Sequence, residues 1–268
     1  MIALLPLPAA AAPTVTLLEA GAEPRAPLRY ALAPGQERRT LQTDADTTIT
    51  VGGLLPDPPP SHATRRLVLT AALEGERLRL RVVEASSETV PAPPRPPRVP
   101  PGALAGSWCE IPVGPTGPTG DAVWHLSAGL PPEAEDALRV ASALLVPLPE
   151  AAVGPGARWQ VHDTVRIGPL ALTVDTVWTL QAAGAQGLAL TARATATAPE
   201  GSAFEEGGLT GTVEALTLSA RNAVTLGPGE WLGAREGTST VQGQVQGRKG
   251  ILSFHLDLDV AQTQRLTP

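Results

Sequence analysis

Three groups of residues have the types and spacing from which proteins build catalytic or metal sites, and the first lies near the C-terminus. His255, Asp257 and Asp259 alternate along one predicted strand, so their side chains project from the same face, within reach of a shared cation. Imidazole and carboxylate groups bind divalent metals, but a single strand supplies too few ligands without a partner loop. We therefore expect a solvated polar face at these three residues and no bound metal ion.

The second group pairs the only cysteine with a histidine. Cys109 lies in the segment Gly-Ser-Trp-Cys-Glu, and His125 follows Trp124. An imidazole base beside a thiol produces a nucleophile for acyl transfer, provided that the two strands are neighbours. The serine alternative lacks support, because no G-x-S-x-G motif occurs in the sequence. We expect Cys109 to be a partly buried, unreactive thiol, and we assign no catalytic residue.

The third group is the adjacent pair His162 and Asp163. Neighbouring residues of a strand point to opposite faces, so these two side chains do not form a dyad with each other. We predict that His162 faces outward into solvent and that Asp163 faces inward, in register with Trp159 and Val165. An inward carboxylate needs hydrogen bonds, a bulge or an arginine partner, so a structural role is expected for Asp163.

The sequence contains none of the common cofactor-binding or metal-binding motifs. Phosphate loops, dinucleotide-binding fingerprints, H-E-x-x-H, EF-hand loops and zinc spacings are absent, so we predict no cofactor. Five tryptophans are present, and Trp159 and Trp178 occupy inward positions of predicted strands. Two interpretations stay open for this pair: packing in the core, or lining a cavity for an apolar ligand.

Composition excludes several classes of function. The chain has 268 residues, a net charge of −6 and 3% aromatic residues. Lys249 is the only lysine, which we attribute to codon usage in a GC-rich bacterial genome. A mildly acidic chain without a basic patch argues against nucleic-acid binding. No apolar run reaches the roughly 18 residues that a membrane-spanning helix needs, and one cysteine allows no internal disulfide.

Alternation of apolar and polar residues dominates the sequence and predicts strands. Leu78, Leu80 and Val82 alternate with arginines, and a Gly-containing turn at 74–76 joins this strand to the preceding one. The pattern recurs in 158–197, 209–218, 237–246 and 249–262. In the last range the residues that face inward are Leu252, Phe254, Leu256, Leu258 and Val260. We predict an all-β fold: a strongly curved antiparallel sheet or open β-barrel of about ten to twelve strands.

Prolines interrupt this alternation at two places, a predicted helix and a connector. One short helix is predicted near 132–145, because Pro131 and Pro132 suit a first turn and Pro147 ends the helix. The segment 91–102, PAPPRPPRVPPG, must be extended and is interpreted as a connector. Residues 25–268 are thus expected to form a single β domain in two halves, 25–90 and 103–268.

Residues 1–24 are interpreted as a signal-like or disordered leader. The start MIALLPLPAAAA combines a short apolar stretch with a small-residue run at Ala9–Ala12, as near a secretory cleavage site. A positive n-region is missing, and Pro6 and Pro8 interrupt the apolar stretch, so a disordered leader stays an alternative. We expect export to the periplasm or cell surface, with a mature chain that starts near Pro13.

The most distinctive segment is Leu148–Trp159, which reads LPEAAVGPGARW. It resembles the L-P-x-x-x-V-G-x-G-x-x-W stretch of an uncharacterised family of bacterial exported β-proteins, many of them lipoproteins. The resemblance implies a short helix before the motif, a threonine-rich meander after it, and export. This chain departs from the lipoprotein members because it has no lipidated cysteine. The family has no established activity to carry over.

These observations rank three functions. The first is a non-enzymatic cell-envelope protein that binds a protein partner or an apolar ligand. The second is a carrier of lipid-like molecules that uses a cavity inside a half-barrel. The third, a hydrolase based on Cys109 or on the His255 strand, is the least favoured.

Overall fold

The computed structural model describes residues 13–30, 35–52, 57–92, 99–131, 134–167, 170–206, 209–249 and 252–268. These residues contain one α-helix, α1 (Ala134–Ser142), one 3-10 helix, η1 (Pro101–Leu104), and sixteen strands. None of the helices in these ranges is long and apolar enough to span a membrane. The strands are β1 (Thr14–Glu19), β2 (Ala26–Pro27), β3 (Gln36–Gly52), β4 (Ser61–Glu74), β5 (Arg77–Val90), β6 (Trp108–Gly114), β7 (Gly117–Pro118), β8 (Val123–His125), β9 (Ala152–Val153), β10 (Arg158–Ile167), β11 (Leu170–Gly184), β12 (Gly187–Thr197), β13 (Ser202–Glu206), β14 (Leu209–Leu226), β15 (Ala234–Lys249) and β16 (Leu252–Thr267).

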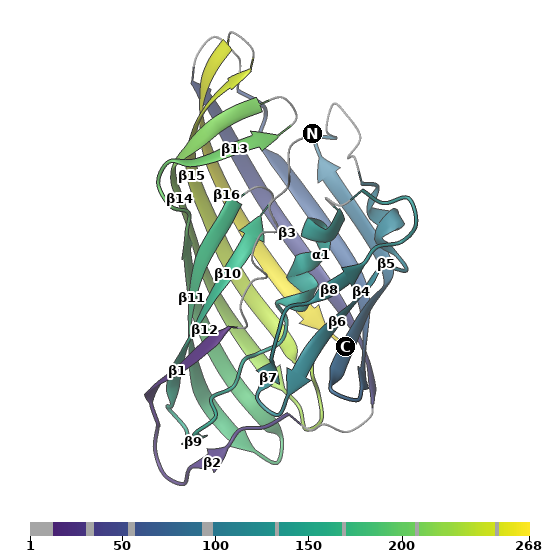
Figure 1. Ribbon diagram of the computed structural model, residues 1–268, viewed down its shortest axis with the longest axis vertical. Helices are drawn as coiled ribbons and strands as arrows, with labels where there is room; N and C mark the ends of the chain where they lie inside the picture. The colour runs from purple at the N-terminus through teal and green to yellow at the C-terminus, as the bar shows by residue number, and fades with distance from the viewer. Residues whose placement is uncertain are drawn as a thin grey trace, which may run out of the picture.

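Fourteen strands form one antiparallel sheet that curves around α1 (Figure 1). Its path runs β1-β10-β11-β12-β14-β15-β16-β3-β4-β5-β6-β7, with β13 beside β14 and β8 beside β6. Among the described strands the path does not close, because β1 lies at one edge and β7 at the other. β2 and β9 form a separate two-stranded ladder. The prediction of a strongly curved, open antiparallel sheet is confirmed, but the sheet contains fourteen strands where about ten to twelve were expected, because short strands such as β7, β8 and β13 add to the long ones.

The C-terminal strand joins the two halves of the chain. β16 pairs with β3 from His255 opposite Gly52 to Thr267 opposite Thr40, so both halves share one sheet. β1 pairs with β10, which brings residues 14–19 of the segment assigned above to a leader into the sheet. Residues 1–12, and residues 93–98 of the proline-rich connector, lie outside the described ranges.

Because side chains alternate along a strand, successive residues lie in turn on the concave and the convex face of the sheet. On β12, Leu190, Ala192 and Ala196 are buried, whereas Thr191 and Arg193 between them are exposed. We call the end of the concave face that carries Leu41 and Leu266 the closed end, because the core lies there. The end that carries Val51 and Leu256 is the open end.

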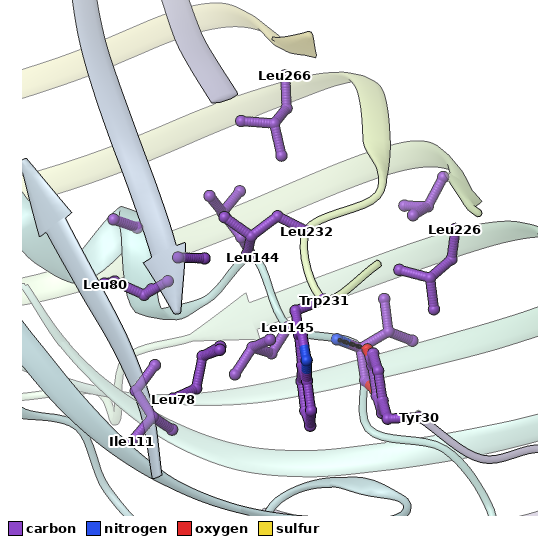
Figure 2. Packing of buried hydrophobic residues seen from close by; sticks show 14 of the residues in the cluster. Tyr30, Leu78, Leu80, Ile111, Leu144, Leu145, Leu226, Trp231, Leu232 and Leu266 are labelled. Atoms are coloured by element: carbon purple, nitrogen blue, oxygen red, sulfur yellow. Dashed lines mark hydrogen bonds between the residues drawn. The ribbon is translucent and has the colours of Figure 1, made fainter. Parts of the chain in front are cut away.

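A short helix and the segments that carry Tyr30, Leu144 and Trp231 fill the closed end. Ala134, Leu138 and Ala141 form a fully buried stripe on α1, as the spacing predicts. The rings of Tyr30 and Trp231 stack with centroids 4.7 Å apart (Figure 2). Around them pack aliphatic residues from both halves of the sheet and from the segment after α1: Leu78, Leu80, Ile111, Leu144, Leu145, Leu226, Leu232 and Leu266.

Buried polar groups fix these loops in place. The Arg235 guanidinium, buried beneath the end of α1, donates hydrogen bonds to the carbonyl oxygens of Leu144 (2.9 Å) and Ala143 (3.4 Å). The Tyr30 hydroxyl donates to the carbonyl of Val146 and accepts from its N–H, both at 3.0 Å. Burial lowers the pKa of Arg235 to about 10, so the guanidinium remains charged at neutral pH.

The glycine-rich segment before β10 forms the predicted turn. Gly156 has a φ of +81°, a conformation that favours glycine, and β10 begins two residues later at Arg158. An added Cβ at Gly154 would collide with the carbonyl oxygen of Ala22, so the chain before β2 packs directly on this turn. Trp159 then enters the core with none of its surface exposed, and its Nε1 donates to the carbonyl of Pro147 at 2.8 Å.

Replacing Trp159 with alanine should strongly destabilise the protein. The substitution removes a fully buried indole and its hydrogen bond to Pro147. Truncation of a buried tryptophan typically costs about 3–5 kcal/mol, a large share of the roughly 5–15 kcal/mol that stabilises a domain. Urea denaturation measures this loss, and Thr173→Ala on the convex face of β11 serves as a control that shifts stability little. Wild-type stability of Trp159→Ala, together with loss of ligand binding, would instead place Trp159 in a binding site.

Candidate ligand-binding face

The row of His255, Asp257 and Asp259, a candidate metal site for which a solvated polar face is expected, lies on the convex face of β16. His255 contacts Glu214 at 3.6 Å and Asp257 at 3.5 Å, and Asp257 accepts a hydrogen bond from Gln244 at 3.0 Å. Asp259 is exposed in the same row. Across the part of the chain that the structure describes, no three histidine, cysteine or acidic side chains are grouped to hold a metal ion.

The structure places Cys109 and His125 on opposite faces of the sheet. Cys109 is fully buried on the concave side, and its pairing partner on β8 is Trp124. His125 pairs with Trp108 instead and stacks on its indole with centroids 3.8 Å apart. Burial raises the pKa of the Cys109 thiol to about 12, so the thiol stays protonated at neutral pH. A cysteine–histidine nucleophile is therefore not assembled.

The orientations predicted for the adjacent pair on β10 are confirmed. His162 faces outward, with its Nδ1 3.0 Å from a carboxylate oxygen of Asp175. Asp163 faces inward and is half-buried, and one carboxylate oxygen accepts the Thr164 N–H at 2.7 Å. Burial, and to a smaller extent the nearby Asp121, raises the pKa of the Asp163 carboxyl above its usual range. The hydrogen bond that Asp163 needs thus comes from the backbone.

Trp159 and Trp178 belong to the core. They lie directly opposite each other on β10 and β11, with 0% and 5% of their surfaces exposed. Both are members of the buried cluster at the closed end. As placed, neither indole lines an exposed surface.

A second apolar surface lies at the open end, separate from the core. It consists of nine inward-facing aliphatic residues on four adjacent strands, and we call it the apolar trough: Leu216 and Leu218 on β14, Val241 and Val245 on β15, Leu256, Leu258 and Val260 on β16, and Ile49 and Val51 on β3. Their side chains are partly exposed and are not part of the buried cluster. Contiguous exposed apolar side chains often mark a binding or interaction site.

Cross-strand register aligns the trough residues in rows. Leu218, Val241 and Val260 lie in one row, and Leu216, Gly243, Leu258 and Ile49 lie in the next. A further row contains Val245, Leu256 and Val51. From the spacing of strands and residues, the trough measures roughly 14 Å in each direction.

Two glycines on β15 allow the trough to form. An added Cβ at Gly243 would come within 2.8 Å of Leu216 Cδ1, and one at Gly247 would collide with the ring of Phe254. Side chains from both neighbouring strands therefore lie over the β15 backbone, which places aliphatic and aromatic groups close together. The inward spacing of Gly237, Gly243 and Gly247 is the signal in the sequence that could have located this surface.

A polar belt separates the trough from the core. Ala45, Ala220 and Gly237 share the inward positions between them with uncharged polar residues, which make up the belt: Thr43, Asn222, Ser239, Gln262 and Gln264. These positions are only partly buried. Arg65 on β4 and Asp163 on β10 lie on the concave face to either side of these strands, and burial lowers the pKa of Arg65. The concave face therefore joins an aliphatic surface to hydrogen-bonding groups.

The convex side of the same strands carries a different kind of surface. A shallow groove of about 380 Å³ there is lined mainly by outward-facing hydroxyl, amide and carboxylate groups, among them Thr48, Thr50, Gln242, Gln244, Asp257 and Asp259. The four strands thus separate a polar face from an aliphatic one.

Comparison with known proteins leaves the site to be interpreted from its geometry. The chain matches no protein-family model, and no curated protein matches it.

Asp163→Asn should stabilise the protein at neutral pH. A raised pKa means that the folded chain binds this proton more tightly than the unfolded chain does. The favourable contribution is full below the unfolded pKa of about 3.9 and is lost as the pH rises through the folded pKa. The asparagine variant should therefore have the higher melting temperature at pH 7, and the gap should shrink towards pH 4.

Asp175→Asn is the matched control with the opposite sign. Hydrogen bonds from His162 and Gln160 lower the pKa of the Asp175 carboxyl, so its contribution is present above the unfolded pKa and lost as the pH falls. This variant should melt lower than the wild type at pH 7. An Asp163→Asn variant that melts lower at pH 7 would contradict the assignment of Asp163 as a desolvated inward carboxylate.

Proposed function

We propose that this is a non-enzymatic binding protein whose apolar trough holds a lipid-like chain. The observation that carries the proposal is the set of nine aliphatic side chains that lie partly exposed on the concave face, outside the core. Concave apolar surfaces with a few polar groups at one side are the usual form of ligand sites. This combines the first two functions that the sequence favours, an apolar-ligand binder and a half-barrel carrier.

The composition of the trough supports a flexible aliphatic ligand. Valine, leucine and isoleucine line it, and none of its nine positions is aromatic or charged. Each methylene removed from water onto such a surface is worth about 0.8 kcal/mol. The polar belt, with the amides of Asn222, Gln262 and Gln264, offers hydrogen-bonding groups for the polar end of an amphiphile.

The geometry weighs against the hydrolase alternative. Cys109 is buried with a raised pKa, and His125 lies on the other face of the sheet. His255, Asp257 and Asp259 face outward, on the side of β16 away from the trough. No catalytic role is proposed for these residues.

The cell envelope is part of the proposal, on the strength of the sequence. The apolar stretch followed by Ala9–Ala12 is typical of an exported chain, and the family that the Leu148–Trp159 segment resembles is exported. Fractionation of cells followed by N-terminal sequencing tests this directly. A mature chain that starts near Pro13 in the periplasmic or surface fraction is expected, whereas retention of Met1 in the cytoplasm would contradict export.

Native mass spectrometry of the purified protein should detect a bound lipid-like molecule. After its removal, the protein should bind a fluorescent fatty acid saturably. The double variant Val241→Thr/Val245→Thr keeps the branched shape of both side chains and adds hydroxyl groups to the trough. Its affinity should fall by at least roughly tenfold, because burying each hydroxyl against an aliphatic chain costs about 1–3 kcal/mol.

The control variant changes the convex face of the same strand. Thr240→Ser alters a side chain that bonds to Ser219 outside the trough, and probe binding should be unchanged. The proposal fails if the native protein carries no lipid and the stripped protein binds no probe. Equal probe affinity of the wild type and the double valine variant would also overturn it.

A further inference from the structure

The sheet pairs acids with bases wherever two ionisable residues lie directly opposite each other, with one exception. Six such pairs combine an acidic and a basic side chain: Glu19–Arg158, Asp46–His62, Glu74–Arg77, Arg79–Glu110, His162–Asp175 and Glu236–Arg265. The exception among the described registers is Arg193 on β12, which lies opposite Arg221 on β14. Two arginine side chains therefore extend from directly opposite positions on the convex face.

This pair lacks the carboxylate partners that Arg158 and Arg265 have. Arg158 contacts Glu19 at 2.9 Å and Arg265 contacts Glu236 at 2.7 Å. Arg193 and Arg221 are both exposed, and within the described ranges neither forms a hydrogen bond or an ion pair. Directly opposite residues have Cβ atoms about 4.5–5.5 Å apart, and like charges at that spacing destabilise a sheet.

Hydroxyl groups surround the two arginines. On the same face, Thr195 follows Arg193 on β12, Ser219 precedes Arg221 on β14, and Thr238 lies opposite Arg221 on β15. The two carboxylates at diagonal positions face other partners. Asp175 accepts hydrogen bonds from Gln160 and His162, and Glu236 is bound to Arg265.

We propose that Arg193 and Arg221 form a binding site for a phosphate-type oxyanion. Guanidinium groups match the geometry of phosphate oxygens and bind them through two parallel hydrogen bonds. An oxyanion between the two side chains attracts both guanidinium groups and offsets their repulsion. The neighbouring hydroxyl groups supply further hydrogen-bond donors. Free phosphate and a phosphomonoester on a larger molecule, such as a lipid headgroup, share this chemistry. The site lies on the convex face and does not depend on the apolar trough.

Thermal melts in phosphate and in chloride at equal ionic strength test the site. Equal ionic strength is needed because salt alone screens the repulsion. The wild type should melt higher in phosphate than in chloride, because a ligand that binds only the folded state stabilises it. Calorimetric titration with inorganic phosphate should show affinity at least about tenfold weaker in Arg193→Gln, since a charged hydrogen bond is lost.

Arg221→Glu is the most informative variant, because it restores the acid–base pattern of the other six pairs. In dilute chloride it should melt higher than the wild type, and it should show no additional rise in phosphate. Arg158→Gln, which removes an arginine that already has a carboxylate partner, should keep the full phosphate response. Fatty-acid binding should be unchanged in Arg221→Glu, so the oxyanion site is tested independently of the apolar trough.

Vesicles distinguish the two sources of the oxyanion. Binding to phosphatidylcholine vesicles that contain phosphatidic acid, lost in Arg221→Glu and absent for phosphatidylcholine alone, assigns a headgroup. A saturable response to free phosphate without vesicle binding assigns a small anion. The proposal is overturned if phosphate and chloride give equal melting temperatures, or if Arg221→Glu responds to phosphate as the wild type does.

Discussion

The buried guanidinium of Arg235 is the interaction on which the rest of the architecture depends. A buried cation is costly unless its hydrogen bonds are satisfied, and here the carbonyl groups of Ala143 and Leu144 at the end of α1 satisfy them. Positive charge at a helix C-terminus is also favoured by the helix dipole. These bonds hold the segment after α1 against the sheet, where Tyr30 binds both polar groups of Val146. The closed end is thereby sealed by loops.

Sealing one end leaves the other end of the same strands exposed. β14, β15, β16 and β3 are sixteen to eighteen residues long, well above the usual length of about 5–6 residues. One short helix and its flanking loops cover only part of that length. The aliphatic residues nearer Arg235 become core, and those beyond the polar belt become the apolar trough. The difference between core and ligand surface is therefore set by what covers a position, because the residue types are the same.

Because coverage by α1 and its flanking loops decides which residues are buried, only some features could be predicted from the sequence. Alternation identifies the strands and the faces of Trp159 and Asp163, since those follow from one strand at a time. Pairing of β16 with β3 joins residues more than 200 positions apart, and no local pattern encodes it. The sequence likewise marks Leu256, Leu258 and Val260 as inward, yet it does not say that nothing from α1 reaches them. The buried role of Arg235 also escaped prediction, because the five residues that follow it on β15 are polar or glycine.

Long-range register also determines which charged residues lie next to each other on the convex face. Considered strand by strand, Arg193 and Arg221 are ordinary outward arginines in threonine-rich segments. Only the pairing of β12 with β14 brings them together, and only the six acid–base pairs elsewhere make them an exception. A sheet whose other charged pairs follow the rule that opposite charges stabilise has no structural reason to break it once. Local conflicts with a rule that the rest of a fold obeys tend to occur at functional positions. The same sheet thus presents an aliphatic surface on β14, β15, β16 and β3 and a cationic pair on β12 and β14, on opposite faces.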